Sequence, residues 1–168
     1  MHSPVVVQHV SDRAGFDNFK TGVVAVHTGS SRTQQAFVTM LVCLLASPNH
    51  CKRILGDSDL LAKLVQSLDQ NHHHFHSVVL KGKVYLLLAE MCARSHSVLL
   101  ACCEQRLVMY IERDSKRVKQ HALGGNATVG VKEGAGVGAE GLEYLHQCLV
   151  VIVMNILITV PKIQQGLL

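Results

Sequence analysis

The chemistry open to this chain depends first on its cysteines and histidines, because thiolates and imidazoles act as nucleophiles and as metal ligands. Four histidines crowd one polar stretch, at His72, His73, His74 and His76. A structural zinc site needs four fixed ligands, whereas the thiols lie far from this stretch, in apolar helical patterns. We therefore interpret the histidine stretch as a solvated linker, and we predict no metal site and no cofactor.

Six cysteines occur without a C-x-x-C pair, and five of them lie inside or beside apolar helical patterns. This distribution favours reduced, buried thiols of a cytosolic protein over a disulfide framework. The pair Cys102-Cys103 leaves open a small thiol-dependent enzyme. A reactive cysteine needs a base and exposure, however, and Cys103 falls on an apolar stripe, which predicts core packing. We therefore predict no catalytic residue.

A glycine-rich run at 134–141 superficially resembles a dinucleotide-binding fingerprint. That fingerprint works only between a strand and the N-terminus of a helix. The residues before this run are further glycines and polar residues, so the sequence does not predict nucleotide binding.

The densest positive charge follows the centre of the chain, in a stretch comprising Arg106, Arg113, Lys116, Arg117 and Lys119. Cations near a helix C-terminus complement the helix dipole, so a solvated cap explains the stretch without a function. The alternative is a patch for acidic tubulin tails or another acidic partner, whose binding should weaken steeply with salt. The net charge of +4 is spread along the chain, which argues against nucleic-acid binding.

Two apolar helical patterns meet within Val78–Arg113, at the polar break Arg94–Ser97. Their apolar residues recur at three- and four-residue steps, which places each set on one helix face. We predict a hairpin of two antiparallel helices that share these faces. The first face comprises Val79, Leu80, Val84, Leu87, Leu88 and Met91, and the second comprises Leu99, Leu100, Cys103, Leu107, Val108 and Ile111.

Shorter patterns flank this hairpin. Ser47-Pro48 should end the first helix, because the residue before a proline disfavours helical geometry. Asp57–Asp59 should cap a later helix with negative charge. The further predicted helices are Ser30–Ala46, His50–Leu55, Leu60–Leu68 and, approximately, Gly141–Thr159.

The longest uncharged apolar run is Cys148–Val160. It is shorter than the roughly 20 apolar residues that cross a bilayer, and it carries Asn155. We therefore predict a buried core helix and no membrane partner.

These elements predict an all-α chain, an armadillo/HEAT-like α-solenoid of stacked helical hairpins with units of about 40 residues. Strand signals are weak, and the chain is 48% hydrophobic with only 4% aromatic residues. A glycine-rich segment with few large apolar residues cannot offset its ordering entropy. The predicted divisions are an irregular or broken-helix segment at 1–31, helical repeats at 32–117, a flexible insertion at 118–140 and a further, incomplete repeat at 141–168.

The run RLVMYIERDS, which begins at Arg106, resembles a segment in the C-terminal armadillo-repeat region of the Unc-51-like kinase four family, which are Fused-related pseudokinases. The preceding Leu80–Leu88 and the later Glu143-Tyr144-Leu145 and Pro161-Lys162-Ile163 are similar to the neighbouring helices of that family. The resemblance covers roughly Val78–Leu168. The kinase-like domain has no counterpart, because the chain lacks a glycine-rich ATP loop, an H-R-D loop and a D-F-G.

The resemblance implies a helical-repeat scaffold of cilia and flagella, tied to microtubules and acting alongside the Fused kinase. No functional residue carries over, because the matching segment is repeat scaffold. We predict a non-catalytic module that binds other proteins, with ciliary or microtubule-linked components of the axoneme as partners and the cytoplasm and cytoskeleton as location. The alternatives are a general cytosolic armadillo/HEAT adaptor and, less favoured, the thiol-dependent enzyme.

Overall fold

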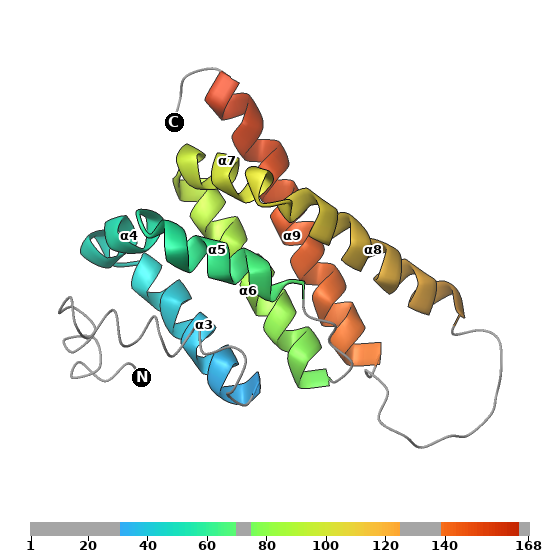
Figure 1. The fold of residues 1–168 in the computed structure, drawn as a ribbon. Coiled ribbons are helices and arrows are strands. Elements are labelled where there is room, and N and C mark those ends of the chain that lie inside the picture. Colours follow the sequence, from blue (N-terminus) through green and yellow to red (C-terminus); the bar gives the residue numbers. More distant parts are fainter. Residues whose placement is uncertain (1–30, 70–74, 125–138, 165–168) are drawn as a thin grey trace.

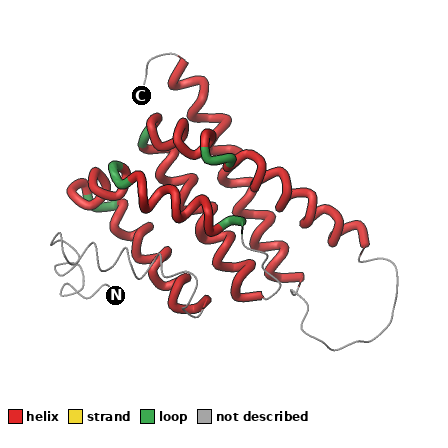
Figure 2. Tube along the Cα trace, viewed as in Figure 1, coloured by secondary structure: helices red, strands yellow, loops and turns green. Residues whose placement is uncertain are grey.

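The computed structural model describes residues 31–69, 75–124 and 139–164, and these ranges hold seven α-helices and no strand. Figure 2 shows short loops or turns where α3, α4 and α5 follow one another and where α6, α7 and α8 do. The prediction of an all-α chain is therefore confirmed for the described residues. The helices are α3 (Ser31–Leu45), α4 (Pro48–Leu55), α5 (Ser58–Ser67), α6 (Phe75–Arg94), α7 (His96–Glu104), α8 (Leu107–Gly124) and α9 (Ala139–Gln164).

Local sequence signals explain several helix ends. Helix α3 ends at Leu45, just before the serine–proline pair, and Pro48 occupies the first turn of α4, where its missing N–H costs nothing. The side chain of Asp57 caps α5 by accepting a hydrogen bond of 2.9 Å from the amide of Leu60. The predicted break before α4 and the predicted acidic cap of α5 are thus both confirmed.

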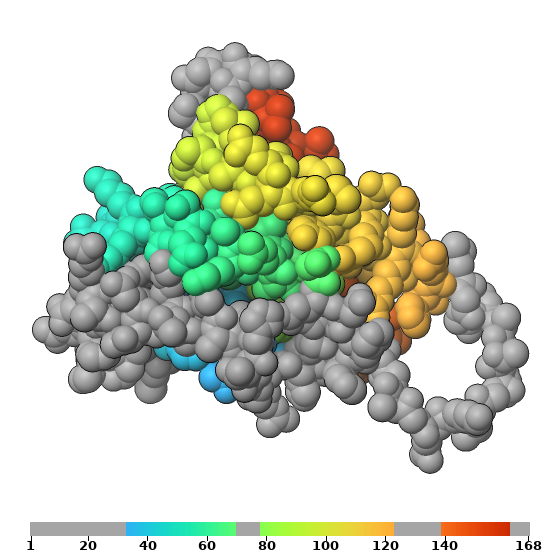
Figure 3. All heavy atoms as spheres, in the orientation of Figure 1, coloured from blue at the N-terminus to red at the C-terminus, as the bar shows by residue number. Residues whose placement is uncertain are grey.

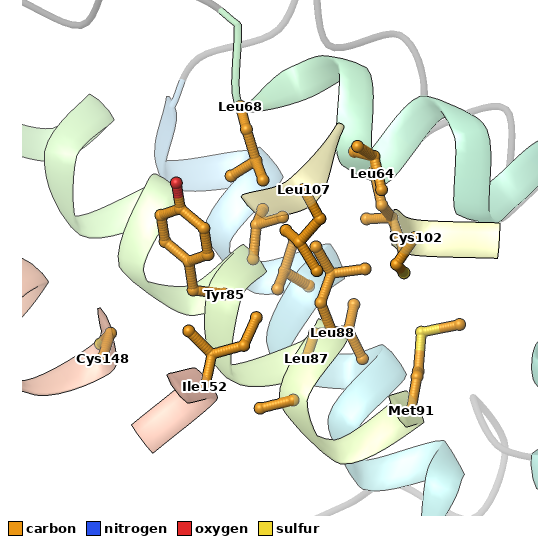
Figure 4. Close-up of a cluster of buried hydrophobic side chains, with 14 of the residues drawn as sticks. Leu64, Leu68, Tyr85, Leu87, Leu88, Met91, Cys102, Leu107, Cys148 and Ile152 are labelled. Atoms are coloured by element: carbon orange, nitrogen blue, oxygen red, sulfur yellow. The ribbon is translucent and has the colours of Figure 1, made fainter. Parts of the chain in front are cut away.

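Helix α6 is the centre of the packing. It lies between α3 and α9 in Figure 1, and its most extensive contacts are with these two helices. Tyr85, Leu87, Leu88 and Met91 of α6 are 0% exposed, so this helix is buried around most of its circumference. Figure 4 shows these side chains with core residues of other helices, among them Leu64, Leu68, Cys102, Leu107, Cys148 and Ile152.

The approach of α9 to α6 is close at Gly82. A Cβ at this position would lie 2.7 Å from Cε1 of Tyr144 and 3.0 Å from Sγ of Cys148. Real Cβ atoms do not approach other heavy atoms at 2.7 Å, so the absence of a side chain at Gly82 allows α9 to pack where it does. This contact joins two segments that are far apart in the sequence.

The predicted hairpin is wrong in its second half. The principal partner of α6 is α9, and the chain after Arg94 forms two helices, α7 and α8, with a change of direction at Gln105-Arg106. Because the helix is interrupted between α7 and α8, the residues predicted to share one helix face do not all lie on the same side. Leu99, Leu107 and Ile111 are buried as predicted, whereas Leu100, Cys103 and Val108 are exposed and Cys102 is buried instead.

The described helices overlap both ends of the insertion predicted at 118–140. Helix α8 continues to Gly124, and Val118 is 9% exposed, so the polar sequence from Val118 onward extends a helix. Helix α9 begins at Ala139. The rest of the predicted insertion, and the predicted N-terminal segment apart from Ser31, lie outside the described residues.

Helix α9 differs from the buried core helix predicted at Cys148–Val160. Cys148, Leu149 and Ile152 are buried against the body of the fold. The opposite face of the helix is exposed from Val150 to Val160. Large apolar side chains exposed there are Val150, Val151, Val153, Met154, Leu157, Ile158 and Val160.

Candidate protein-interaction site

A buried polar network ties α6 to α8. The ammonium group of Lys81 lies 3.2 Å from Oδ2 of Asp114, and the hydroxyl of Tyr85 donates to the same oxygen at 2.8 Å. Lys81 and Tyr85 are one helical turn apart, so both reach one carboxylate on the neighbouring helix. The side chains of Lys81 and Asp114 are 3% and 2% exposed, which makes this a fully desolvated ion pair.

The electrostatics of this network follow from its burial. Burial lowers the pKa of Lys81, an effect that the Asp114 carboxylate opposes. Burial, with the same carboxylate beside it, raises the pKa of the Tyr85 hydroxyl. A substrate cannot reach side chains that are closed off in this way. The network therefore positions α8 on α6, and it has the character of a structural tie.

Arg113 extends the network toward the surface. Its guanidinium forms ion pairs with Asp114 at 3.3 Å and with Asp69 at 3.1 Å, and it also donates to the carbonyl of Leu68. The same group lies 5.0 Å from the centre of the Tyr110 ring, which is a cation–π distance. Arg113 thus fastens the end of α5 to α8, and Tyr110 is held beside it.

The five basic residues predicted as a patch differ in their surroundings, and their role in binding a partner stays a prediction. Arg113 is engaged inward, Lys116 pairs with Glu112 at 2.6 Å, and the half-buried Arg117 contributes positive charge beside the buried network. Helical spacing puts Lys119 well round α8 from the face that carries Arg113 and Arg117. Among these five residues, only Arg106 lines the groove described next.

A cavity of about 350 Å³ lies where α5 meets the junction of α7 and α8. Figure 3 shows this region of the surface, with α5 in green and the junction in yellow. The junction contributes Glu104, Gln105 and Arg106, and the first turn of α8 contributes Tyr110. The remaining lining residues come from α5 and are Ala62, Val65 and Gln66. We name this cavity the junction groove.

The backbone at Arg106 shapes the junction groove. Its φ angle is 67°, and it is the one non-glycine residue with positive φ in the described part of the chain. For a residue with a side chain this left-handed conformation costs roughly 1–2 kcal/mol. The amide of Arg106 closes the end of α7 on the carbonyl of Cys103, and its carbonyl accepts from the amide of Met109 to begin α8. No glycine or proline marks this break, so the sequence does not predict it.

The exposed side of α9 is the largest apolar feature outside the core. No aspartate, glutamate, lysine or arginine occurs between Glu143 and Lys162. By length and composition, Ala139–Pro161 is apolar enough to cross a membrane, with a mean hydropathy of 1.8 and only 28% of the residues buried. Core helices of soluble proteins can be as long and as apolar but are mostly buried, and α9 packs on α6 only along one side, through Leu145, Cys148 and Ile152. We name its outward side the α9 face.

The described residues contain no group of three or more histidine, cysteine, aspartate or glutamate side chains that could hold a metal ion. His72, His73 and His74 lie outside the described residues, as does most of the glycine run at 134–141. The linker prediction is wrong for His76, which lies in the first turn of α6 because that helix begins at Phe75. The predictions for the other three histidines and for the glycine run stay predictions.

The thiols differ in access. Cys103, which was predicted to pack in the core, is exposed, because α7 turns Cys102 inward instead. The hydrogen bond to Cys92, together with burial, raises the pKa of Cys102, and burial raises the pKa of the Cys103 thiol. A raised pKa leaves less thiolate at neutral pH, which is the opposite of what a nucleophilic cysteine needs.

We expect a thiol reagent such as Ellman's reagent to modify Cys103 first in the folded protein, because it is exposed while Cys92, Cys102 and Cys148 are buried. The buried three should react only as the protein unfolds in denaturant. Absorbance followed over time should show separate phases of thiol modification, and Cys103→Ser should remove the first phase. Fast labelling of Cys102 or Cys92 in the folded state would instead favour the thiol-dependent enzyme.

The comparisons with known proteins include a distant relationship. No protein-family model matches the chain, and no solved structure matches it. The mouse protein named serine/threonine-protein kinase ULK4 is 25% identical over 161 residues, which are 96% of this chain and 11% of that protein. The chain therefore spans about a tenth of the length of this relative. The chain, which is all-helical in the residues that the structure describes, is distantly related to this kinase-named protein.

Proposed function

We propose that this chain is a non-catalytic armadillo/HEAT-type scaffold that binds other proteins in a microtubule-associated assembly of the cilium or flagellum. The observation that carries the binding role is the α9 face, which holds seven of the eleven large apolar side chains exposed in the described residues. The ciliary setting rests on the resemblance of the RLVMYIERDS segment and its neighbours to the pseudokinase family. The distant relationship to the kinase-named mouse protein supports that resemblance.

The order of the helices supports a repeat architecture. Helices α4, α5 and α6 increase in length from 8 to 10 to 20 residues, and α7, α8 and α9 increase from 9 to 18 to 26. Helices that are three places apart along the chain pack on each other. Helix α3 contacts α6, and α6 contacts α9 (Figure 1). A recurring unit of two shorter helices and one long helix is the pattern expected of a stacked solenoid.

The same repetition indicates what covers the α9 face. Helix α9 packs on α6 through apolar residues spaced by three and four positions, and the α9 face offers another such set at Val150, Val153, Met154 and Leu157. Exposed apolar patches of this kind mark interaction sites. The occupant that fits is an amphipathic helix of a partner protein, docked on α9 as α9 docks on α6.

We expect negative charge on the α9 face to abolish binding to the neighbouring proteins in ciliated cells. The variant Val153→Glu/Leu157→Glu should fold normally, because both side chains are 37% or more exposed, and it should lose the axonemal and microtubule-linked proteins found by proximity labelling. The reason is that a buried, unpaired carboxylate is costly at an apolar interface.

Val42→Glu is the matched control, because Val42 is another exposed apolar residue but lies on α3. It should keep the neighbours of the wild type. If the wild type, Val42→Glu and the double variant all label the same diffuse cytosolic proteins, the ciliary role is wrong and the general adaptor is the better description. Binding of the wild type to protein-free liposomes, lost in the double variant, would show that a membrane covers the α9 face.

A further inference from the structure

The junction groove has the shape and charge of a second binding site, on a different surface from the α9 face. It is a cavity of about 350 Å³ between two helical units, and its lining is neither wholly apolar nor wholly charged. Its floor includes Val65, and its rim carries Arg106, Glu104 and two glutamines. A concave site with a few polar groups is the usual form of a site that recognises a specific group.

One wall of the groove is held in place from behind. Tyr110 lines the cavity, and the Arg113 guanidinium lies 5.0 Å from the centre of its ring. Arg113 is itself held by Asp69, by Asp114 and by the carbonyl of Leu68. The aromatic wall is therefore attached to the buried Lys81–Asp114 pair, and a ligand meets a surface that is already organised.

Arg106 is the residue of the junction groove that we expect to contact a ligand. It occupies a left-handed position that glycine would fill without strain. It is exposed at the groove, and within the described residues its guanidinium has neither an ion pair nor a hydrogen bond to another side chain. An outlying backbone conformation that presents an unengaged cation to a cavity is the kind of feature that functional sites contain.

The charges of the groove select the ligand. Arg106 is the one cation of the lining and Glu104 is the one acid. The nearby Arg113 is already paired with Asp69 and Asp114, so Arg106 is the cation left to bind an anionic group. A guanidinium binds a carboxylate with two parallel hydrogen bonds. Glu104, Gln66 and Gln105 can in turn accept from or donate to peptide groups on either side of such a carboxylate.

We propose that the junction groove binds an acidic side chain of a partner polypeptide, with Arg106 holding the carboxylate and Tyr110 supporting it. This inference deepens the proposed protein-binding function by naming the chemistry of a partner, and it rests on that function. It does not depend on the α9 face, which recognises an apolar helix.

The test uses the full chain and a fluorescein-labelled peptide of eight glutamates, with the corresponding peptide of eight glutamines as the neutral reference. Fluorescence anisotropy should show binding of the acidic peptide only, weakening as salt screens the charges. Arg106→Gly should weaken this binding about tenfold, since one charge-assisted contact is lost, and should raise the midpoint of thermal unfolding because the strained position is relieved. A loss of binding together with a gain of stability cannot come from misfolding.

Lys119→Gln also removes one positive charge, but from α8 outside the groove, so its effect should be small. An equal loss of binding in Lys119→Gln and Arg106→Gly would show that the peptide reads the basic stretch as a whole, which overturns the groove proposal. Absence of peptide binding, or tight binding of free glutarate alone, also overturns it. Val153→Glu/Leu157→Glu should still bind the peptide, so failure of the groove and failure of the α9 face are distinguishable.

Discussion

Replacing Asp114 with alanine is expected to lower the free energy of unfolding by about 3–5 kcal/mol, because it leaves a buried ammonium group without its partner. Lys81 is 3% exposed and Tyr85 is 0% exposed, so neither can recover its hydrogen bond by turning to water. Domains of this size have roughly 5–15 kcal/mol of stability in total. Urea unfolding followed by circular dichroism should therefore show a large decrease in the midpoint.

A triple variant separates the cost of an orphaned charge from the value of the network. Lys81→Met/Tyr85→Phe/Asp114→Leu removes all three polar groups and keeps the volume nearly constant, so it should regain most of the lost stability. Glu112→Ala is the surface control, because its ion pair with Lys116 is exposed, and its urea midpoint should match the wild type. If Asp114→Ala unfolds at the wild-type midpoint, the network is not closed from water.

The second large effect is expected at Gly82. Replacing it with valine puts a branched side chain where a Cβ alone would lie 2.7 Å from the ring of Tyr144. Overpacking of this kind typically costs about 1–3 kcal/mol, although valine favours a helix slightly more than glycine does. The α6–α9 contact is the largest in the fold, so the loss should appear as a lower thermal midpoint.

The partner substitution tests the mechanism. Tyr144→Ala should destabilise the wild type by removing packing, but it should cost much less in the Gly82→Val protein because it opens the space that valine needs. A double-mutant cycle measures this difference as a coupling free energy. Strictly additive effects would mean that Gly82 and Tyr144 are not in contact.

The sequence predicts the centre of the fold well and its second half poorly. The face of Leu80, Val84, Leu87, Leu88 and Met91 is buried as its three- and four-residue spacing indicates. The next pattern misleads, because periodicity is continuous across Arg106 while the backbone is not. A positive φ at an arginine leaves no compositional signal, and the partner of α6 comes from a helix far along the chain. Neither fact is available from local spacing.

Only part of the candidate site is predictable from the sequence, because the rest depends on how the helices pack. Arg106 was singled out for its charge and does line the groove, whereas Arg113 is committed to Asp69 and Asp114. The buried pair did carry a signal, since Lys81 and Asp114 are charged residues inside apolar helical patterns. Buried charges are almost never left unpaired, so each of them predicts a partner. Which partner it meets depends on how α8 crosses α6, and that is a property of the assembled fold.

If a helix of a partner protein covers the α9 face, as we propose, site-specific photocrosslinking should capture that partner. A benzophenone side chain at Leu157, which is 61% exposed, would be activated in living ciliated cells, with position 42 on α3 as the control. We expect a discrete crosslinked product at position 157, absent at position 42, whose second component is an axonemal or microtubule-linked protein joined through a helix. Crosslinking at position 157 to lipid alone, or to no protein, would show that no partner helix covers the α9 face.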